Sequence, residues 1–156
     1  SAEVRGQYIA FIRQTRGADA AREEIVTMLE AGHDAVVLRA LRAGLDFDAG
    51  NQDEAIARFN MCAELDPKIP DLHRLRANVM LRLGNPDRAI KACEKALALE
   101  RQNYMAHYVL AMAYRRKSKG DMALDQVNQA LDIYPSYEPA RQLRQEILSL
   151  QKAGEL

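Results

Sequence analysis

The chain repeats itself with a fixed period of about 34 residues, and this spacing limits the folds that are open to it. Residues 50–56 recur as 84–90, and a weaker third copy spans 118–124. Downstream of each copy the same columns align again: Phe59, Cys93, Val127, then Cys62, Ala96, Ala130, then Leu65, Leu99, Ile133. A fixed period of about 20–50 residues indicates stacked structural units rather than one wrapped core. Such a stack usually presents a surface that holds partners, so the period predicts a class of function.

Within each unit the apolar residues recur at helical spacing, as Ile56, Phe59 and Ala63 do. All five prolines fall between the periodic stretches, which suits helices because proline is excluded from their interiors. Short polar residues such as Asn85 and Asn103 stand near the expected helix starts, and Gly50, Gly84 and Gly120 stand in the expected turns. We therefore predict helices over 36–48, 53–66, 70–83, 87–100, 104–117, 121–134 and 138–151.

The segment 1–33 is less regular. We predict one helix near 3–15, a turn over 17–21 and a second helix that contains Ile25, Met28 and Leu29. Because Ile25 precedes Phe59 by one repeat period, this segment is expected to be a divergent helix pair. The whole chain then has eight or nine helices and no strands. Since the pattern reaches the start of the chain, a domain cut from a longer protein and a separate array both stay open.

Composition and motifs narrow the function. Lysine plus arginine equals aspartate plus glutamate, 22 each, so no overall charge favours nucleic acid or membrane. No apolar run approaches the roughly 18–20 residues that span a bilayer, and no signal peptide is visible. Cys62 and Cys93 occupy small or apolar columns, which favours buried free thiols, and unpaired thiols favour the cytoplasm. No phosphate loop, dinucleotide fingerprint, nucleophile elbow or zinc-protease motif occurs, and Asp46 and Asp48 are expected to be solvated or helix-end charges. We expect neither an enzyme nor a cofactor.

The columns of the third unit resemble the tetratricopeptide repeat. Residues 108–114 match its first helix, and Ala123, Val127, Ala130 and Pro135 match its second. Arg39, His73 and His107 depart from it at the large aromatic place, and Arg101 replaces a closing proline. The resemblance implies an all-α, right-handed α-solenoid of antiparallel helix pairs. It further implies one array, divided into a divergent pair over 1–33, repeats over 36–67, 70–101 and 104–135, and a capping helix over 138–151.

The resemblance also implies a concave groove lined by the first helix of each pair. The first strong repeat would supply Val37, Ala40, Gly44, Phe47 and Asp48, although core packing of Val37, Ala40 and Phe47 is the alternative. Arginine beside asparagine suits carboxylates, while tyrosine and methionine offer apolar contact, so the expected partner is a protein segment that is part apolar and part acidic. The alternative is that the arginines form a solvated helix face. The predicted partner-binding residues are Arg74, Asn78, Leu81, Arg82, Met105, Tyr108, Met112, Arg115 and Arg116.

Some co-chaperones in this family hold the C-terminal carboxylates of heat-shock chaperones with a clamp of Lys, Asn, Asn, Lys and Arg. Arg74 and Asn78 reproduce its first two places, but Val109, Pro139 and Leu143 occupy the others. We therefore expect no full clamp.

The histidines could suggest a metal site, and the basic run 115–119 could suggest nucleic-acid binding. His73 and His107 occupy equal places in neighbouring repeats, on the order of 10 Å apart, so one zinc ion with bonds near 2 Å cannot join them. Packing is therefore the expected role. The basic run 115–119 ends a helix, and the helix dipole explains it better than nucleic acid does. The leading hypothesis is a non-catalytic binding module, and a self-associating scaffold or a regulatory array flanking a catalytic domain is the alternative.

Overall fold

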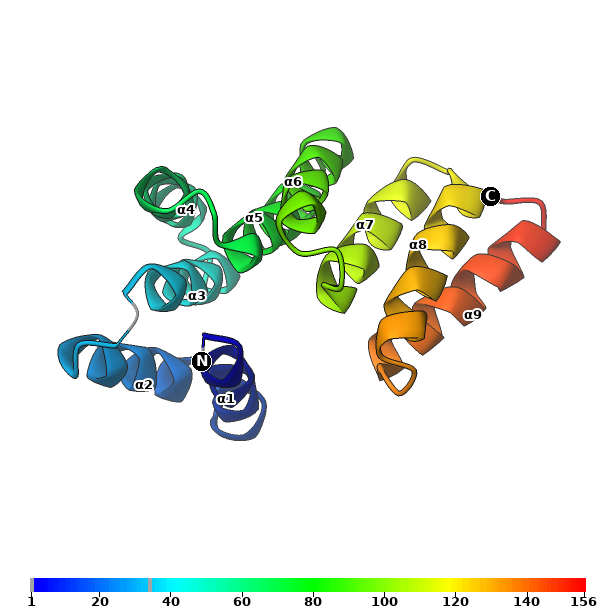
Figure 1. The fold of residues 1–156 in the computed structure, drawn as a ribbon. Helices are drawn as coiled ribbons and strands as arrows, with labels where there is room; N and C mark the ends of the chain where they lie inside the picture. The colour runs from blue at the N-terminus through cyan, green and yellow to red at the C-terminus, as the bar shows by residue number, and fades with distance from the viewer. Residues whose placement is uncertain (1, 34) are drawn as a thin grey trace. The chain divides into compact units, whose positions relative to one another are not determined.

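A computed structural model describes residues 2–33 and 35–156, and the regular structure in these ranges is entirely helical (Figure 1). Consecutive helices pack as antiparallel pairs, as α3 does with α4 and α7 with α8. The nine helices of the described residues are α1 (Ala2–Arg16), α2 (Ala18–Glu30), α3 (Ala35–Asp48), α4 (Gln52–Leu65), α5 (Pro70–Arg82), α6 (Pro86–Leu99), α7 (Tyr104–Arg116), α8 (Gly120–Ile133) and α9 (Glu138–Lys152).

The helices confirm the all-α prediction and lie close to the expected ranges. From α3 onward each observed end falls within one residue of the predicted end. The N-terminal turn is shorter than predicted, because Gly17 alone separates α1 from α2. Its φ of 92° is a left-handed conformation that glycine adopts readily, so one residue suffices to break the helix.

The chain divides into two compact units, one ending at Leu75 and the other beginning at Arg76, so that α5 contributes to both. The first unit has a core made by Ile9, Ile12, Ala21, Ile25, Leu38 and Leu45. The second unit has one core around Cys93 and Val109 and another around Val127 and Ile147. The expectation that the whole chain forms one continuous array, with the repeat boundaries given above, stays a prediction.

Small residues at one column of the repeat explain the close helix packing. Ala21, Ala55, Ala89 and Ala123 follow one another at the repeat period, and each is fully buried. The column four residues later is also buried, and it holds Ile25, Phe59, Cys93 and Val127. The alanines let the helix backbones approach, and the larger side chains fill the space between them.

The turn after the first helix of each repeat has one recurring geometry. Gly50 and Gly84 have φ of 93° and 75°, and the following amides of Asn51 and Asn85 donate to the carbonyls of Asp46 and Met80. This pattern is a Schellman motif, which caps a helix through a left-handed residue. In the third copy Ser118 takes this place with φ of 54°.

Gly120 was expected in that third turn, and this prediction was wrong. Gly120 is the first residue of α8 and is buried. An added Cβ there would lie 2.9 Å from Nε2 of Gln151 and 3.2 Å from Cβ of Leu156. A larger residue here would require the Gln151 and Leu156 side chains to shift, so glycine suits the close packing at the start of α8 rather than a left-handed turn.

The turn after the second helix also repeats. Asp66, Glu100 and Tyr134 are extended, with φ of −146°, −144° and −133° and ψ of 89°, 95° and 86°. Proline follows Asp66 and Tyr134, whereas Arg101 follows Glu100. The residue after the helix therefore has nearly the same backbone conformation at all three turns, with or without a following proline.

Candidate functional site

The residues predicted to bind a partner lie on two helices, Arg74, Asn78, Leu81 and Arg82 on α5 and the other five on α7. Arg74 belongs to the first unit and is described by itself. Its Nε donates to Oδ1 of Asp71 over 3.0 Å, and its side chain is largely buried. Arg74 therefore already has a carboxylate partner within its own helix.

Tyr108, Met112 and Arg115 are spaced by four and three residues, so they share one face of α7. Tyr108 is half-buried, and its ring meets that of Tyr137 edge-on, with centroids 5.4 Å apart. Met112 is partly buried against both cores of the second unit. Asn78 and Met105 are likewise half-buried, and Arg82 is exposed.

Arg115 forms an ion pair with Glu146 of α9, which the sequence analysis did not predict. Burial raises the pKa of the Tyr108 hydroxyl; the charge of Arg115 acts in the opposite direction, and that of Glu146 in the same direction. The repeat spacing could have indicated that Glu146 lies beside this face, because Glu146 follows Met112 by one repeat period. We refer to Tyr108, Met112, Arg115 and Glu146 as the α7–α9 surface.

Three further tyrosines gather beside this surface. The ring of Tyr104 meets those of Tyr134 and Tyr137 edge-on at 5.1 and 5.0 Å, and Tyr134 stacks on Tyr137 at 6.0 Å. Edge-on and offset pairs are the favoured aromatic geometries. These contacts join α7 to the turn between α8 and α9. The sequence did not predict these contacts, because Tyr134 was expected within the helix over 121–134, whereas Tyr134 and Tyr137 both lie in the turn after α8.

The other basic side chains at the end of α7 have partners within the second unit. Arg116 donates through Nη1 to the carbonyl of Leu81, and Lys117 donates to Asp87. The hydrogen bond and charge of Lys117 hold the pKa of the Asp87 carboxyl below its ordinary value. The Leu81 side chain is only 4% exposed and packs in the core with Cys93 and Val109, so we leave it out of the surface proposed below.

The residues carried over from the first strong repeat lie mostly in the core. Val37, Ala40 and Phe47 are buried, which agrees with the packing alternative. Asp48 forms an ion pair with Arg13 of α1. These positions offer little surface to a partner.

The two repeat-related histidines have equivalent hydrogen bonds. Nε2 of His73 lies 2.7 Å from the carbonyl of Pro67, and Nε2 of His107 lies 3.1 Å from that of Arg101. Each Nε2 therefore donates to the carbonyl six residues earlier. Nδ1 of His107 lies 2.8 Å from Oε1 of Gln126. The part of the chain that the structure describes contains no group of three or more metal-binding side chains.

Cys62 and Cys93 are both buried, as their columns predicted. Burial raises the pKa of the Cys62 thiol, although Arg39 and Arg58 act in the opposite direction. A raised pKa keeps the thiol protonated and therefore unreactive.

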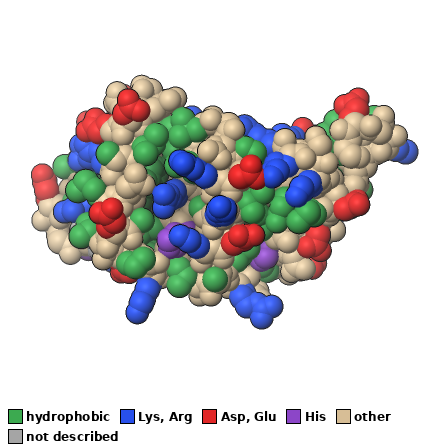
Figure 2. All heavy atoms as spheres, turned by 90° about the horizontal axis from the view of Figure 1, so that it is seen from above, with side chains coloured by type: hydrophobic (Ala, Val, Ile, Leu, Met, Phe, Trp, Pro, Cys, Tyr) green, Lys and Arg blue, Asp and Glu red, His purple; other side chains and the backbone are tan. Residues whose placement is uncertain are grey.

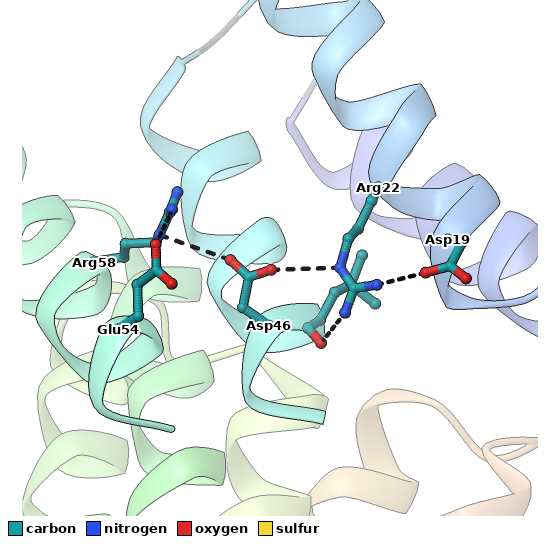
Figure 3. A network of polar contacts seen from close by, with 6 residues as sticks. Asp19, Arg22, Asp46, Glu54 and Arg58 are labelled. Atoms are coloured by element: carbon teal, nitrogen blue, oxygen red, sulfur yellow. Dashed lines mark hydrogen bonds and ion pairs between the residues drawn. The ribbon is translucent and has the colours of Figure 1, made fainter. Parts of the chain in front are cut away.

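Asp46 was expected to be a solvated or helix-end charge. It does lie in the last turn of α3, but it is not solvated. It is 8% exposed, and its two oxygens lie 3.4 Å from Nε of Arg22 and 3.7 Å from Nε of Arg58 (Figure 3). Arg22 also donates to the carbonyl of Leu45 over 2.8 Å. Asp46 occupies the column of Met80 and Tyr114, so its column indicated a packed position.

Around Asp46 the charges form a network across the first unit (Figure 3). Arg22 of α2 pairs with Asp19 over 2.6 Å, and Arg58 of α4 pairs with Glu54. The hydrogen bond and charge of Arg58 lower the pKa of the Glu54 carboxyl. The network thereby joins α2, α3 and α4 through opposite charges.

Surface charge is mixed, as the balanced composition predicts. Figure 2 shows basic, acidic and hydrophobic side chains interspersed over the face that it draws. None of the described helices is long and apolar enough to cross a bilayer.

The chain is a helical-repeat protein. Its buried alanines recur at the repeat period, and its turns have recurring caps. The chain matches the family model of the tetratricopeptide repeat over residues 40–99 and 74–138. It belongs to the tetratricopeptide repeat family.

Curated relatives match part of their own length. The DnaJ homolog subfamily C member 7 homolog of Schizosaccharomyces pombe is 29% identical over 109 residues, which is 67% of this chain and 22% of that protein. Human protein O-mannosyl-transferase TMTC1 is 27% identical over 107 residues, which is 69% of this chain and 12% of that protein. The chain thus spans less than a quarter of either relative.

Solved structures share the fold. The first TPR domain of human RPAP3 is 24% identical with a TM-score of 0.72, over 77% of this chain and 94% of that one. The first TPR of Spaghetti (RPAP3) bound to the HSP90 peptide SRMEEVD is 24% identical with a TM-score of 0.70, over 75% of this chain and 93% of that one. MamA is 21% identical with a TM-score of 0.67, over 92% of this chain and 83% of that one.

Proposed function

We propose that the chain is a non-catalytic binding module whose α7–α9 surface holds a segment of a partner protein. The observation that carries the proposal is the placing of Tyr108, Met112 and Arg115 on one face of α7, with Glu146 of α9 beside them. Aromatic, methionine and arginine side chains are enriched in protein interfaces. Among structures with this fold, the first and second TPR domains of RPAP3 were solved with HSP90 and HSP70 peptides.

The recognition proposed for this chain differs from a clamp on a C-terminal carboxylate. Val109 and Leu143, which stand in two of the clamp places, are buried among apolar side chains. Neither side chain can donate a hydrogen bond to a carboxylate. We therefore propose that the partner presents an internal segment, part apolar and part acidic, rather than its last residue.

The proposed function is tested by selecting binders from a library of random short peptides. Selected peptides should bind Arg115→Glu about tenfold more weakly, because reversing an interface charge typically costs over ~1 kcal/mol. Arg141→Glu is the matched control, since Arg141 is exposed on α9 and pairs only locally with Glu138. Melting temperatures of both variants report on folding. Equal binding by both variants, or no selected peptide, would contradict the proposal.

A self-associating scaffold is the second candidate. Phe11 and Tyr8 lie three residues apart on α1, and both are exposed. Exposed aromatic side chains on one helix face are typical of contact surfaces. Sedimentation over a range of concentrations tests this candidate, and Phe11→Glu should abolish any self-association. A mass that does not change with concentration would exclude it.

A further inference from the structure

We propose that Glu146 is a built-in competitor for the partner: its carboxylate occupies the place on Arg115 that an acidic side chain of the partner takes on binding. The inference rests on the proposed function and adds a mechanism of selection to it. Partner capture then exchanges one carboxylate for another on the same guanidinium.

The pair is placed so that it can be exchanged. Arg115 of α7 and Glu146 of α9 interact through Nη1 and Oε1, with 29% and 54% of their side chains exposed. Because Glu146 is half-exposed, water and solutes reach its carboxylate. Exposed ion pairs contribute little to stability, so releasing Glu146 into water costs little.

The neighbouring cations are engaged elsewhere. Arg116 donates to the carbonyl of Leu81, and Lys117 pairs with Asp87 of α6. Arg115 instead pairs with Glu146 and shares a face of α7 with Tyr108, seven residues earlier. A carboxylate that replaced Glu146 would therefore meet a guanidinium with an aromatic ring beside it.

The repeat spacing places Glu146 in the same column as two of the predicted partner-binding residues. It follows Met112 by one repeat period, and Met112 follows Asn78 by the same interval. The three residues thus hold one column on α5, α7 and α9. Glu146 is the acidic member of this column, and its charge is the one an acidic partner segment would carry.

This arrangement selects by charge. A neutral segment cannot replace the ion pair, so it gains only the apolar contact with Tyr108 and Met112. An acidic segment gains the same contact and also restores the pair on Arg115. Charge-assisted hydrogen bonds to a guanidinium are stronger than neutral ones, which gives the acidic segment its advantage.

The test uses two synthetic probes, N-acetyl-Leu-Glu-Glu-Leu amide and the same peptide with both glutamates replaced by glutamine. Binding is followed by amide chemical shifts of α7 in wild-type protein and in Glu146→Gln. The variant should bind the acidic probe about two- to fivefold more tightly, the range set by the strength of an exposed pair. The neutral probe should bind both proteins equally.

Two further variants make the result specific. In the double variant Glu146→Gln with Arg115→Gln the gain should disappear, because no guanidinium is left to receive the acidic probe. Glu138→Gln is the matched control, since Glu138 is an exposed glutamate of α9 that pairs with Arg141. It should leave the affinity for both probes unchanged. A purely structural pair would lower the melting temperature of Glu146→Gln without raising its affinity.

The possible failures are distinct. If library peptides bind in an Arg115-dependent way but Glu146→Gln binds the acidic probe no more tightly, the inference fails and the proposed function stands. An equal gain for both probes also overturns the inference. If neither the library nor the probes bind, both proposals fail.

Discussion

Ser118 holds a left-handed backbone conformation at the position where the other two repeats have glycine. A residue with a Cβ atom is strained there by roughly 1 kcal/mol, and glycine relieves the contact at some cost in chain entropy. We expect Ser118→Gly to raise the free energy of unfolding by about 0.5–1 kcal/mol. Urea denaturation measures the change. Gly84→Ala, the reverse change at the matched position, should lower stability by about 1 kcal/mol, and stabilisation by both variants would contradict the strain.

Asp87 provides a test of the hydrogen bond with Lys117. Its carboxyl pKa is lowered from the ordinary 3.8 by that hydrogen bond and by the lysine charge. A lowered pKa means that the stabilisation is present above the ordinary value and is lost as the pH falls through the folded-state value. Carbon-detected NMR titration should show the lowered pKa, and Lys117→Met should raise the pKa of Asp87 towards its ordinary value. An unchanged pKa in Lys117→Met would show that the pair does not persist in solution.

Individual residues show where prediction from sequence stops. The columns correctly placed Cys62, Cys93 and His73 in buried positions, because a fixed repeat period determines which side of a helix each residue faces. His107, in the equivalent column, is only partly buried. The columns did not predict the hydrogen-bond partners of the two histidines. These partners are the carbonyls of Pro67 and Arg101, which belong to turns and not to the helical columns. Asp46 was placed at the surface because aspartate is rarely buried without partners, and its partners Arg22 and Arg58 come from other helices.

At the scale of elements, the tyrosine contacts attach α9 to the second unit. Tyr137 meets Tyr104 and Tyr108 edge-on and stacks on Tyr134. We expect Tyr137→Ala to lower the free energy of unfolding by about 1–3 kcal/mol, the range for losing a half-buried ring and its aromatic pairs. Amide hydrogen exchange should quicken in α9. Tyr137→Phe keeps the ring and should lose less stability than Tyr137→Ala, and an equal loss in both variants would point to the hydroxyl instead.

The helices themselves were predictable because several local signals agree. Apolar spacing, prolines at the junctions and capping by Asn85 and Asn103 all mark the same ends, and both asparagines accept backbone hydrogen bonds as expected. The contact between Arg115 and Glu146 was not predicted, because it depends on how α9 packs after a turn.

At the scale of the whole molecule, each unit has its own buried core. Stability in repeat proteins is held mostly between neighbouring elements, so a change in one unit should act locally. We expect Asp46→Asn to lower stability by about 1–3 kcal/mol, because Arg22 and Arg58 lose their shared carboxylate. Hydrogen exchange should quicken in α2, α3 and α4 while α8 keeps its protection. Equal loss of protection in α8 would show instead that the chain unfolds as one cooperative body.

The turn at Glu100 and Arg101 has a consequence for how such chains diverge. Glu100 has nearly the same extended backbone as Asp66 and Tyr134, although only those two precede proline. The residue before a proline is confined to this region, so the Glu100 turn keeps a proline-compatible shape that no proline enforces. A position whose conformation is held by its neighbours can accept substitutions without altering the fold. Repeat sequences can therefore diverge at single positions while the backbone geometry persists. The first TPR domain of human RPAP3 illustrates this, since it is 24% identical to this chain with a TM-score of 0.72.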